Sequence, residues 1–194
     1  MTLLAPTLQA WFTDRLMTQK NASPCTIAAY RDTLRLLLVF AHQQIGKEPC
    51  QLDFADLDAP LIGAFLNYLE QDRGNSPKTR NARLAAIHSL YRYSAPRHPE
   101  HAATIARVIE IPTKRHQRTM ISYLDRPEID ALLEAPDRAI WLGRRDHAML
   151  LTAIQTGVRV SELVNLTIAS LSLGTGAHLR VLGKGLSSYC TSWG

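Results

Sequence analysis

The string TGVRVSELVNL, residues 156–166, places Arg159 between two valines, directly after a glycine. A guanidinium between β-branched residues is either half-buried for packing or directed at an anion, since its planar donors match phosphate or carboxylate oxygens. Glu162 follows three residues later, so the two side chains could also form only an ion pair that caps a helix. The choice between these interpretations depends on the rest of the chain.

The charge of the whole chain favours an anionic partner. The 194 residues carry 22 Lys and Arg against 17 Asp and Glu, which gives a net charge of +5 and a pI near 9.3. Such a positive field is typical of proteins that bind nucleic acid or an anionic surface, with plain solubility as the alternative. The three separated cysteines fit reduced thiols, and no signal peptide or membrane span is evident, so we expect a cytoplasmic protein.

Apolar periodicity predicts five helices in the first 112 residues. They are expected over residues 7–20, 23–46, 60–71, 76–94 and 100–108. Thr7 is the expected cap of the first helix, while Ser23 and Ser76 each precede a proline at the first helical position. The predicted core residues are Leu8, Trp11, Phe12, Leu16, Ile27, Tyr30, Leu34, Leu38, Ala41, Ile62, Phe65, Leu66, Leu69, Leu84, Ile87 and Tyr91.

The segment from Ser76 to Arg97 contains five cations and no carboxylate. It repeats the Ser-Pro-x-Thr start of the helix at Ser23, where backbone N–H groups and a hydroxyl can meet phosphate. Cationic and polar residues lie on one arc of each helix, which favours a pair of helices that face DNA over plain solvent-exposed surfaces. The candidate DNA-contacting residues, with two from the segment that follows, are Thr26, Arg31, Arg35, Lys78, Thr79, Arg80, Asn81, Arg83, His88, Arg92, Lys114 and Arg115.

A basic linker follows the helices. The string IPTKRHQRTMIS, residues 111–122, combines a proline and several cations with a loss of apolar periodicity. We therefore predict a helical domain at residues 1–112, the linker at 113–122 and a second domain at 123–194.

The second domain is predicted to mix helices with a small sheet. Asp125 and Glu128 form a capping pair, a buried helix follows over residues 144–155, and Ser161 is the expected cap of a short helix. Alternation around a glycine turn over residues 171–182 predicts a β-hairpin. No continuation of the sheet is evident after Gly185.

The residues around Arg159 and the predicted hairpin resemble a known family. The string LLTAIQTGVRVSELVNLTIASL, followed by a hairpin and LGKG, resembles the start of the catalytic domain of tyrosine recombinases, the phage integrase family. The resemblance implies a mainly α fold, with an N-terminal helical SAM-like core-binding domain and the first half of an α+β integrase catalytic domain that carries a small β-hairpin. It also implies double-stranded DNA as partner, further protomers on the same DNA, and no membrane, small-molecule substrate or cofactor.

The resemblance gives three residues a chemical role in DNA strand exchange, in which a tyrosine attacks a phosphodiester without metal or ATP. Arg159 would hold the scissile phosphate, because a bidentate guanidinium matches the charge that gathers on the nonbridging oxygens of the phosphorane. Glu162 would orient this arginine, and Lys184 would protonate the leaving 5′ oxygen. A metal site is not expected, since His98 and His101 have ligand spacing but no cluster of Cys or acidic partners.

The sequence also departs from the family. After the hairpin the family has a His-x-x-Arg motif, a further His or Trp and the nucleophilic tyrosine, and none of these follows the hairpin here. Tyr189 lies five residues after Lys184, where the family has the third strand of its sheet, so we reject it as the nucleophile. We therefore expect a truncated, catalytically incomplete copy. The alternatives are a module that occupies or regulates recombination sites without cutting, and a helical protein-interaction domain.

Overall fold

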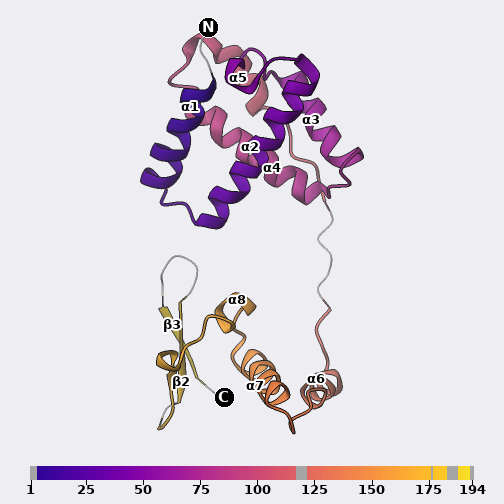
Figure 1. Ribbon diagram of the computed structural model, residues 1–194, viewed down its shortest axis with the longest axis vertical. Coiled ribbons are helices and arrows are strands. Elements are labelled where there is room, and N and C mark those ends of the chain that lie inside the picture. The colour runs from indigo at the N-terminus through magenta and orange to yellow at the C-terminus, as the bar shows by residue number, and fades with distance from the viewer. Residues whose placement is uncertain (1–3, 117–121, 176, 183–187, 193–194) are drawn as a thin grey trace. The chain divides into compact units, whose positions relative to one another are not determined.

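The computed structural model describes residues 4–116, 122–175, 177–182 and 188–192 (Figure 1). The chain divides into two compact units, Met1–Arg118 and Thr119–Gly194. The division falls inside the segment predicted as a linker. No helix among the described residues is both long enough and apolar enough to cross a membrane.

The first unit is built from helices alone. Its elements are α1 (Leu4–Ala10), the π-helical segment η1 (Trp11–Gln19), α2 (Pro24–Ile45), the 3-10 turn η2 (Pro49–Gln51), α3 (Ala59–Gln71), α4 (Pro77–Ser94), the 3-10 turn η3 (Pro99–His101) and α5 (Ala102–Ile109). Helix α4 lies against α2, α3, α5 and η1. It is therefore the central helix of the unit.

The predicted caps of α2 and α4 are confirmed. Ser23 Oγ accepts a hydrogen bond from the Thr26 backbone N–H at 3.3 Å, and Ser76 Oγ accepts one from Thr79 in the same way. The expected start at Thr7 is wrong, because the helix already begins at Leu4, whose N–H donates to Leu52 O at 2.9 Å. This tertiary bond fixes the first turn three residues earlier than local capping signals indicate.

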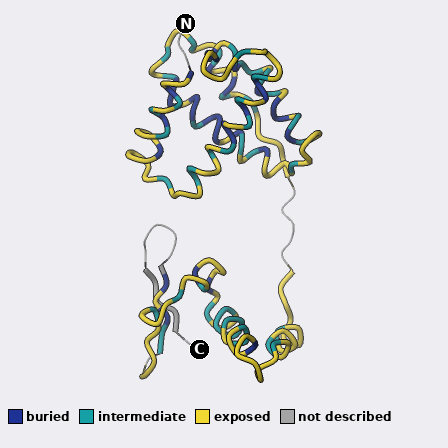
Figure 2. The backbone as a smooth tube through the Cα atoms, in the orientation of Figure 1, coloured by how far each residue is buried: buried dark blue, intermediate teal, exposed yellow. Residues whose placement is uncertain are grey.

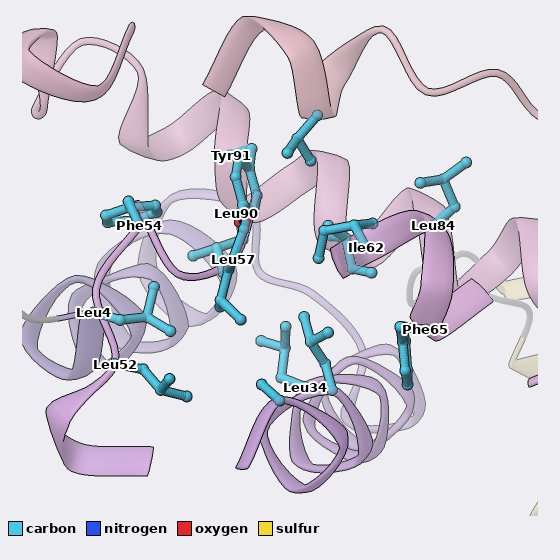
Figure 3. Close-up of a cluster of buried hydrophobic side chains, with 14 of the residues drawn as sticks. Leu4, Leu34, Leu52, Phe54, Leu57, Ile62, Phe65, Leu84, Leu90 and Tyr91 are labelled. Atoms are coloured by element: carbon cyan, nitrogen blue, oxygen red, sulfur yellow. Dashed lines mark hydrogen bonds between the residues drawn. The ribbon is translucent and has the colours of Figure 1, made fainter. Parts of the chain in front are cut away.

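The core of the helical unit gathers the apolar stripes of all these helices (Figure 3). Most of the predicted core residues are buried, among them Trp11, Leu34 and Phe65, and Trp11 stacks on Tyr30 with ring centroids 5.6 Å apart. Tyr91 is also buried, and its hydroxyl donates to Leu57 O at 2.5 Å. Burial raises the pKa of Tyr91 above its ordinary value, so the phenol stays protonated and remains a donor.

The second unit combines short helices with a three-stranded sheet. Its elements are α6 (Arg126–Glu134), α7 (Trp141–Thr156), α8 (Val160–Leu163), the 3-10 turn η4 (Ile168–Ser170), β1 (Leu171–Ser172), β2 (His178–Leu182) and β3 (Ser188–Ser192). The sheet is antiparallel in the order β1-β2-β3. The predicted hairpin is confirmed. The sheet continues after Gly185, which the residue pattern did not indicate, because β3 pairs with β2 and places Tyr189 opposite Val181, in the stretch where the resemblance has a third strand.

Burial in the second unit differs from the prediction. The capping box of Asp125 and Glu128 is confirmed, whereas the helix predicted as buried over residues 144–155 leaves Ala148 and Ile154 exposed. Figure 2 shows α7 mostly in the teal and yellow of partly buried and exposed residues. Helix α7 contacts α6 and α8, but among the described residues of α7 only Gly143 is fully buried. A small cluster of Val158, Leu179 and Val181, with Leu163 and Leu166 beside it, forms the buried part of this unit.

The Tyr91 hydrogen bond gives a test of the helical core. Tyr91→Phe should lower the free energy of unfolding by about 1–3 kcal/mol, because it leaves the buried carbonyl of Leu57 without a donor. Urea unfolding followed by helical circular dichroism measures the change. Tyr68→Phe is the matched control, since Tyr68 packs on Phe40 and its hydroxyl has no hydrogen bond among the described residues. Equal stabilities of the two variants would contradict the role of this bond.

Candidate nucleic-acid interface

A cationic pocket of about 470 Å³ lies between η1, α2 and the second half of α4. Four cations line it, two from the η1 end and two from the α4 end: Arg15, Lys20, Arg92 and Arg97. The polar side chains of Gln19, Tyr30 and Ser89 complete its wall, and no carboxylate lines it. Cations that converge without a counterion form a receptor for an anion.

Two of these cations are held in place by their own neighbours. The Arg97 guanidinium carbon lies 3.7 Å from the centre of the Tyr93 ring, and Arg97 Nη1 donates to Tyr93 O at 2.9 Å. Arg15 Nη1 donates to Gln19 Oε1 at 2.9 Å. Lys20 and Arg92 are exposed and form no ion pair within the described residues. The pocket thus combines two positioned guanidinium groups with two cations that can turn toward a ligand.

The neighbouring pocket along α4, about 230 Å³, has an ion pair in its wall. Arg83 Nη2 lies 2.9 Å from Asp32 Oδ2, and Arg35 Nη2 lies 3.3 Å from Asp32 Oδ1. The hydrogen bond from Arg83, with a smaller contribution from Arg35, holds the pKa of Asp32 below its ordinary value. The positive charges of Arg83 and Arg35 are therefore partly neutralised by a carboxylate of α2.

Two of the candidate DNA-contacting residues do not face solvent, which corrects the helical arc predicted for α4. Arg80 is buried, with its side chain 8% exposed and its Nε 3.7 Å from Glu70 Oε2. His88 is 8% exposed, and its Nε2 donates to Val108 O at 3.0 Å. The arc prediction failed because α4 is enclosed by α3 and α5 on this side, and a helical wheel does not show which neighbours cover a face.

The remaining candidates lie at or near the surface. Arg31, Lys78, Arg92, Lys114 and Arg115 are exposed, and Asn81 is half-buried. The hydroxyl groups of Thr26 and Thr79 lie 3.0 and 3.1 Å from the capping serines. These two threonines thus take part in the helix caps, and whether any of these residues contacts DNA stays a prediction.

Sequence reasoning missed three lining cations of the pocket, Arg15, Lys20 and Arg97. Arg97 belonged to the carboxylate-free segment, so the signal was present, but it lies past the end of α4 and outside the helical arc. Arg15 and Lys20 lie about 70 residues away along the chain from the α4 cations. Only the packing of η1 against α4 brings them to the same pocket.

The second candidate site is the Arg159–Glu162 pair at the start of α8. Arg159 is the N-cap residue, which corrects the prediction of Ser161. Glu162 Oε2 accepts from the Arg159 backbone N–H at 2.9 Å, and Glu162 Oε1 accepts from Arg159 Nη1 at 3.1 Å. The Glu162 side chain is 7% exposed and that of Arg159 74% exposed. The buried carboxylate thus holds an exposed guanidinium, while Lys184 lies outside the described residues.

The two histidines with metal-ligand spacing have other partners. His98 Nε2 lies 2.7 Å from Thr7 Oγ1, and its Nδ1 lies 3.2 Å from Glu100. His101 Nε2 lies 3.3 Å from Asp53 Oδ1. Within the part of the chain that the structure describes, no three His, Cys, Asp or Glu side chains gather as a metal site. These contacts tie η3 to α1 and to the loop before α3.

Comparisons with known proteins agree on one family. Residues 10–98 match the family described as "Phage integrase, N-terminal SAM-like domain". The chain is 56% identical over 188 residues to y4rC of Sinorhizobium fredii, which is named as an integrase/recombinase. This match covers 97% of this chain and 57% of that protein. It is 37% identical over 175 residues to the tyrosine recombinase XerC of Pelobacter propionicus, which covers 88% of this chain and 53% of that protein.

A solved structure has the same fold. The XerH site-specific recombinase bound to palindromic difH substrate, in a post-cleavage complex, matches with a TM-score of 0.63 at 19% identity. The match covers 89% of this chain and 50% of that one. The chain thus spans about half the length of the relatives it matches, and it shares the fold of the matched part of the XerH structure.

The buried imidazole of His88 makes the stability of the helical unit depend on pH. Burial, with a smaller effect of Arg92, lowers the pKa of His88 below its ordinary value of 6.5. Below pH 6.5 the imidazole therefore binds a proton more readily in the unfolded chain than in the folded one. As the pH is lowered, the free energy of unfolding decreases by at most about 1.4 kcal/mol per pH unit. We expect His88→Gln to remove this part of the acid sensitivity.

The measurement is urea unfolding at pH 7.5 and 5.5, followed by circular dichroism. The exposed His116 supplies the control variant, His116→Gln, which should lose as much stability on acidification as the unsubstituted protein. An equal loss in the His88→Gln variant would show that the buried imidazole contributes nothing.

Proposed function

We propose, given that this chain belongs to the tyrosine recombinase family of phage integrases, that its helical unit binds double-stranded DNA along α4 and acts in site-specific recombination. The observation that carries the proposal is the pocket beside α4, which is lined by four cations and by no carboxylate. Further protomers on the same DNA are part of the proposal, as the sequence resemblance implies.

The DNA backbone is the anion that best suits this surface. Phosphate contacts provide most of the affinity of such interfaces and come from Arg and Lys side chains and small polar groups. The pocket offers Lys20 and Arg92, which have no ion pair among the described residues, and the exposed Lys78 and Arg31 add positive charge on α4 and α2. A ligand with repeated phosphates can occupy all of these positions at once.

For the second unit we propose that Arg159 contacts the scissile phosphate. The support is its geometry, because Glu162 holds one side of the guanidinium and leaves the rest of the group exposed. A fixed, exposed guanidinium is preorganised for a phosphate whose charge grows in the transition state. Lys184 would complete this part of the site as the proton donor, in line with the sequence resemblance.

Removal of the two unpaired cations of the pocket tests DNA binding. The double variant Lys20→Ala, Arg92→Ala should bind a short random-sequence duplex several-fold more weakly than the unsubstituted chain. The slope of log affinity against log salt should shrink by about two, since each lost phosphate contact removes about one released counterion. Fluorescence anisotropy at several salt concentrations measures both quantities.

The control for this titration is Arg107→Ala. Arg107 is exposed on α5 and does not line the pocket, so its loss should leave the slope almost unchanged. If both variants changed the slope equally, the pocket would have no special role. Binding that is weak and independent of salt would instead favour a helical protein-interaction domain.

A nicked suicide duplex tests whether the 194 residues cut DNA by themselves. We expect binding without a covalent adduct, because a phosphodiester is not broken by electrostatic stabilisation without a positioned nucleophile. Denaturing gel electrophoresis with labelled DNA detects any adduct. An adduct on Tyr189 or any other residue would refute this expectation and with it the non-cutting alternative.

A further inference from the structure

The chain does not leave the helical unit where its last helix ends. After α5, residues 112–114 lie along α4, and the Asn81 side chain holds both polar groups of one backbone residue. Asn81 Nδ2 donates to Lys114 O at 2.7 Å, and Asn81 Oδ1 accepts from Lys114 N at 3.0 Å. A carboxamide is the one side chain that offers a donor and an acceptor side by side for such a pair.

A second holding point comes from α3. Glu70 Oε2 accepts from Lys114 Nζ at 2.6 Å and lies 3.7 Å from Arg80 Nε. Arg80 Nη1 also reaches Pro112 O at 3.5 Å. The side chains of Glu70 and Arg80 are 15% and 8% exposed. Because removing one partner of a buried ion pair is costly, the Glu70 carboxylate has to stay near Arg80. The Lys114 side chain is 51% exposed, so its ammonium adds a weaker, surface contact to this pair.

These contacts determine where the tether to the second unit begins. Ile111 packs against the core of the helical unit, so without the contacts the free segment would begin at Pro112. With them the last contact moves to Lys114, and the second unit's first helix is capped at Asp125. The tether is thus about three residues shorter, or roughly 10 Å less in reach at about 3.3–3.6 Å per residue.

We propose that Asn81 and Glu70 are positioning residues that fasten the start of the linker to α4 and so set the length of the tether to the second unit. The consequence for DNA rests on the proposed function, since α4 also borders the cationic pocket. If DNA binds beside α4, the same helix would then also set how far from that DNA the second unit can reach. A shorter tether confines the second unit to a smaller volume and raises its effective concentration at the DNA.

The fastening itself is tested without DNA, on the intact chain. Asn81→Ala should make the Lys114 backbone amide exchange with deuterium about tenfold faster, since both hydrogen bonds to the backbone disappear. Trypsin should also cleave faster after Arg115. Lys114→Ala is the discriminating variant, because it keeps the two backbone bonds to Asn81 and loses only the ammonium contact with Glu70. It should therefore accelerate exchange at residue 114 less than Asn81→Ala does.

A folding control keeps this test decisive. Asn81→Asp keeps the acceptor and loses the donor, so it should give an intermediate exchange rate even if Asn81→Ala unfolds. Helical circular dichroism and the exchange of α2 amides report whether the core is intact. Equal exchange at residue 114 in the unsubstituted protein and in a folded Asn81→Ala or Asn81→Asp variant would overturn the proposal.

Hydroxyl-radical footprinting on a duplex selected by the intact chain from a random pool tests the consequence. Glu70→Gln, which weakens the hold on Lys114 at a residue outside the candidate DNA contacts, should keep the protection that depends on Arg92, while protection by the second unit should spread over up to about three more base pairs, at about 3.4 Å each. Unchanged footprints together with faster exchange would overturn the role in positioning. No protection by the unsubstituted chain would instead contradict the proposed function, and the exchange rates alone would then decide whether the fastening exists.

Discussion

The positive charge of α4 is the constraint on which much of the helical unit depends. The helix carries four cations and no carboxylate, so the counterions for its buried side have to come from other elements. Glu70 of α3 pairs with Arg80, and Asp32 of α2 pairs with Arg83. On the open side Lys78 and Arg92 have no acidic partner among the described residues. On one side of the helix the cations thus pair with carboxylates of other helices, and on the other side the described residues offer them no such partner.

This division separates two kinds of cation that look alike in the sequence. A buried guanidinium is tolerated only with a partner, so Arg80 fixes the position of α3 against α4. Arg83 is partly buried and adds an ion pair between α4 and α2. An exposed cation loses little by staying hydrated, and it keeps its charge available for a ligand. The structural cations hold the fold and the start of the linker, while the exposed ones provide the surface that we assign to DNA.

The Arg159–Glu162 pair shows the same principle on a smaller scale. The buried carboxylate accepts from the backbone N–H of Arg159, the N-cap residue of α8, and from one edge of its guanidinium at the same time. A structural role as a helix cap and a role toward phosphate are therefore compatible, since the cap leaves the other edge of Arg159 exposed. The two interpretations of this arginine describe different parts of one arrangement.

The sequence by itself determined the features that depend on neighbouring residues. The Ser-Pro starts of α2 and α4, the capping box at Asp125 and the hairpin of β1 and β2 are local, because their partners lie within a few residues. The family also followed from the sequence, since the string around Arg159 is contiguous. The residues of β3 by themselves did not indicate a strand, because β3 carries no charge and no clear alternation, although the resemblance has the third strand of the family's sheet in this stretch.

Only the tertiary structure decided which side of α4 is covered. The burial of His88 and Arg80, the start of α1 at Leu4 and the hold of Asn81 on Lys114 involve partners 20 to 48 residues away along the chain. Arg15 and Lys20 join the α4 cations across a still longer separation. Helical periodicity gives the faces of one helix, but the packing of several helices selects which face stays open to a ligand.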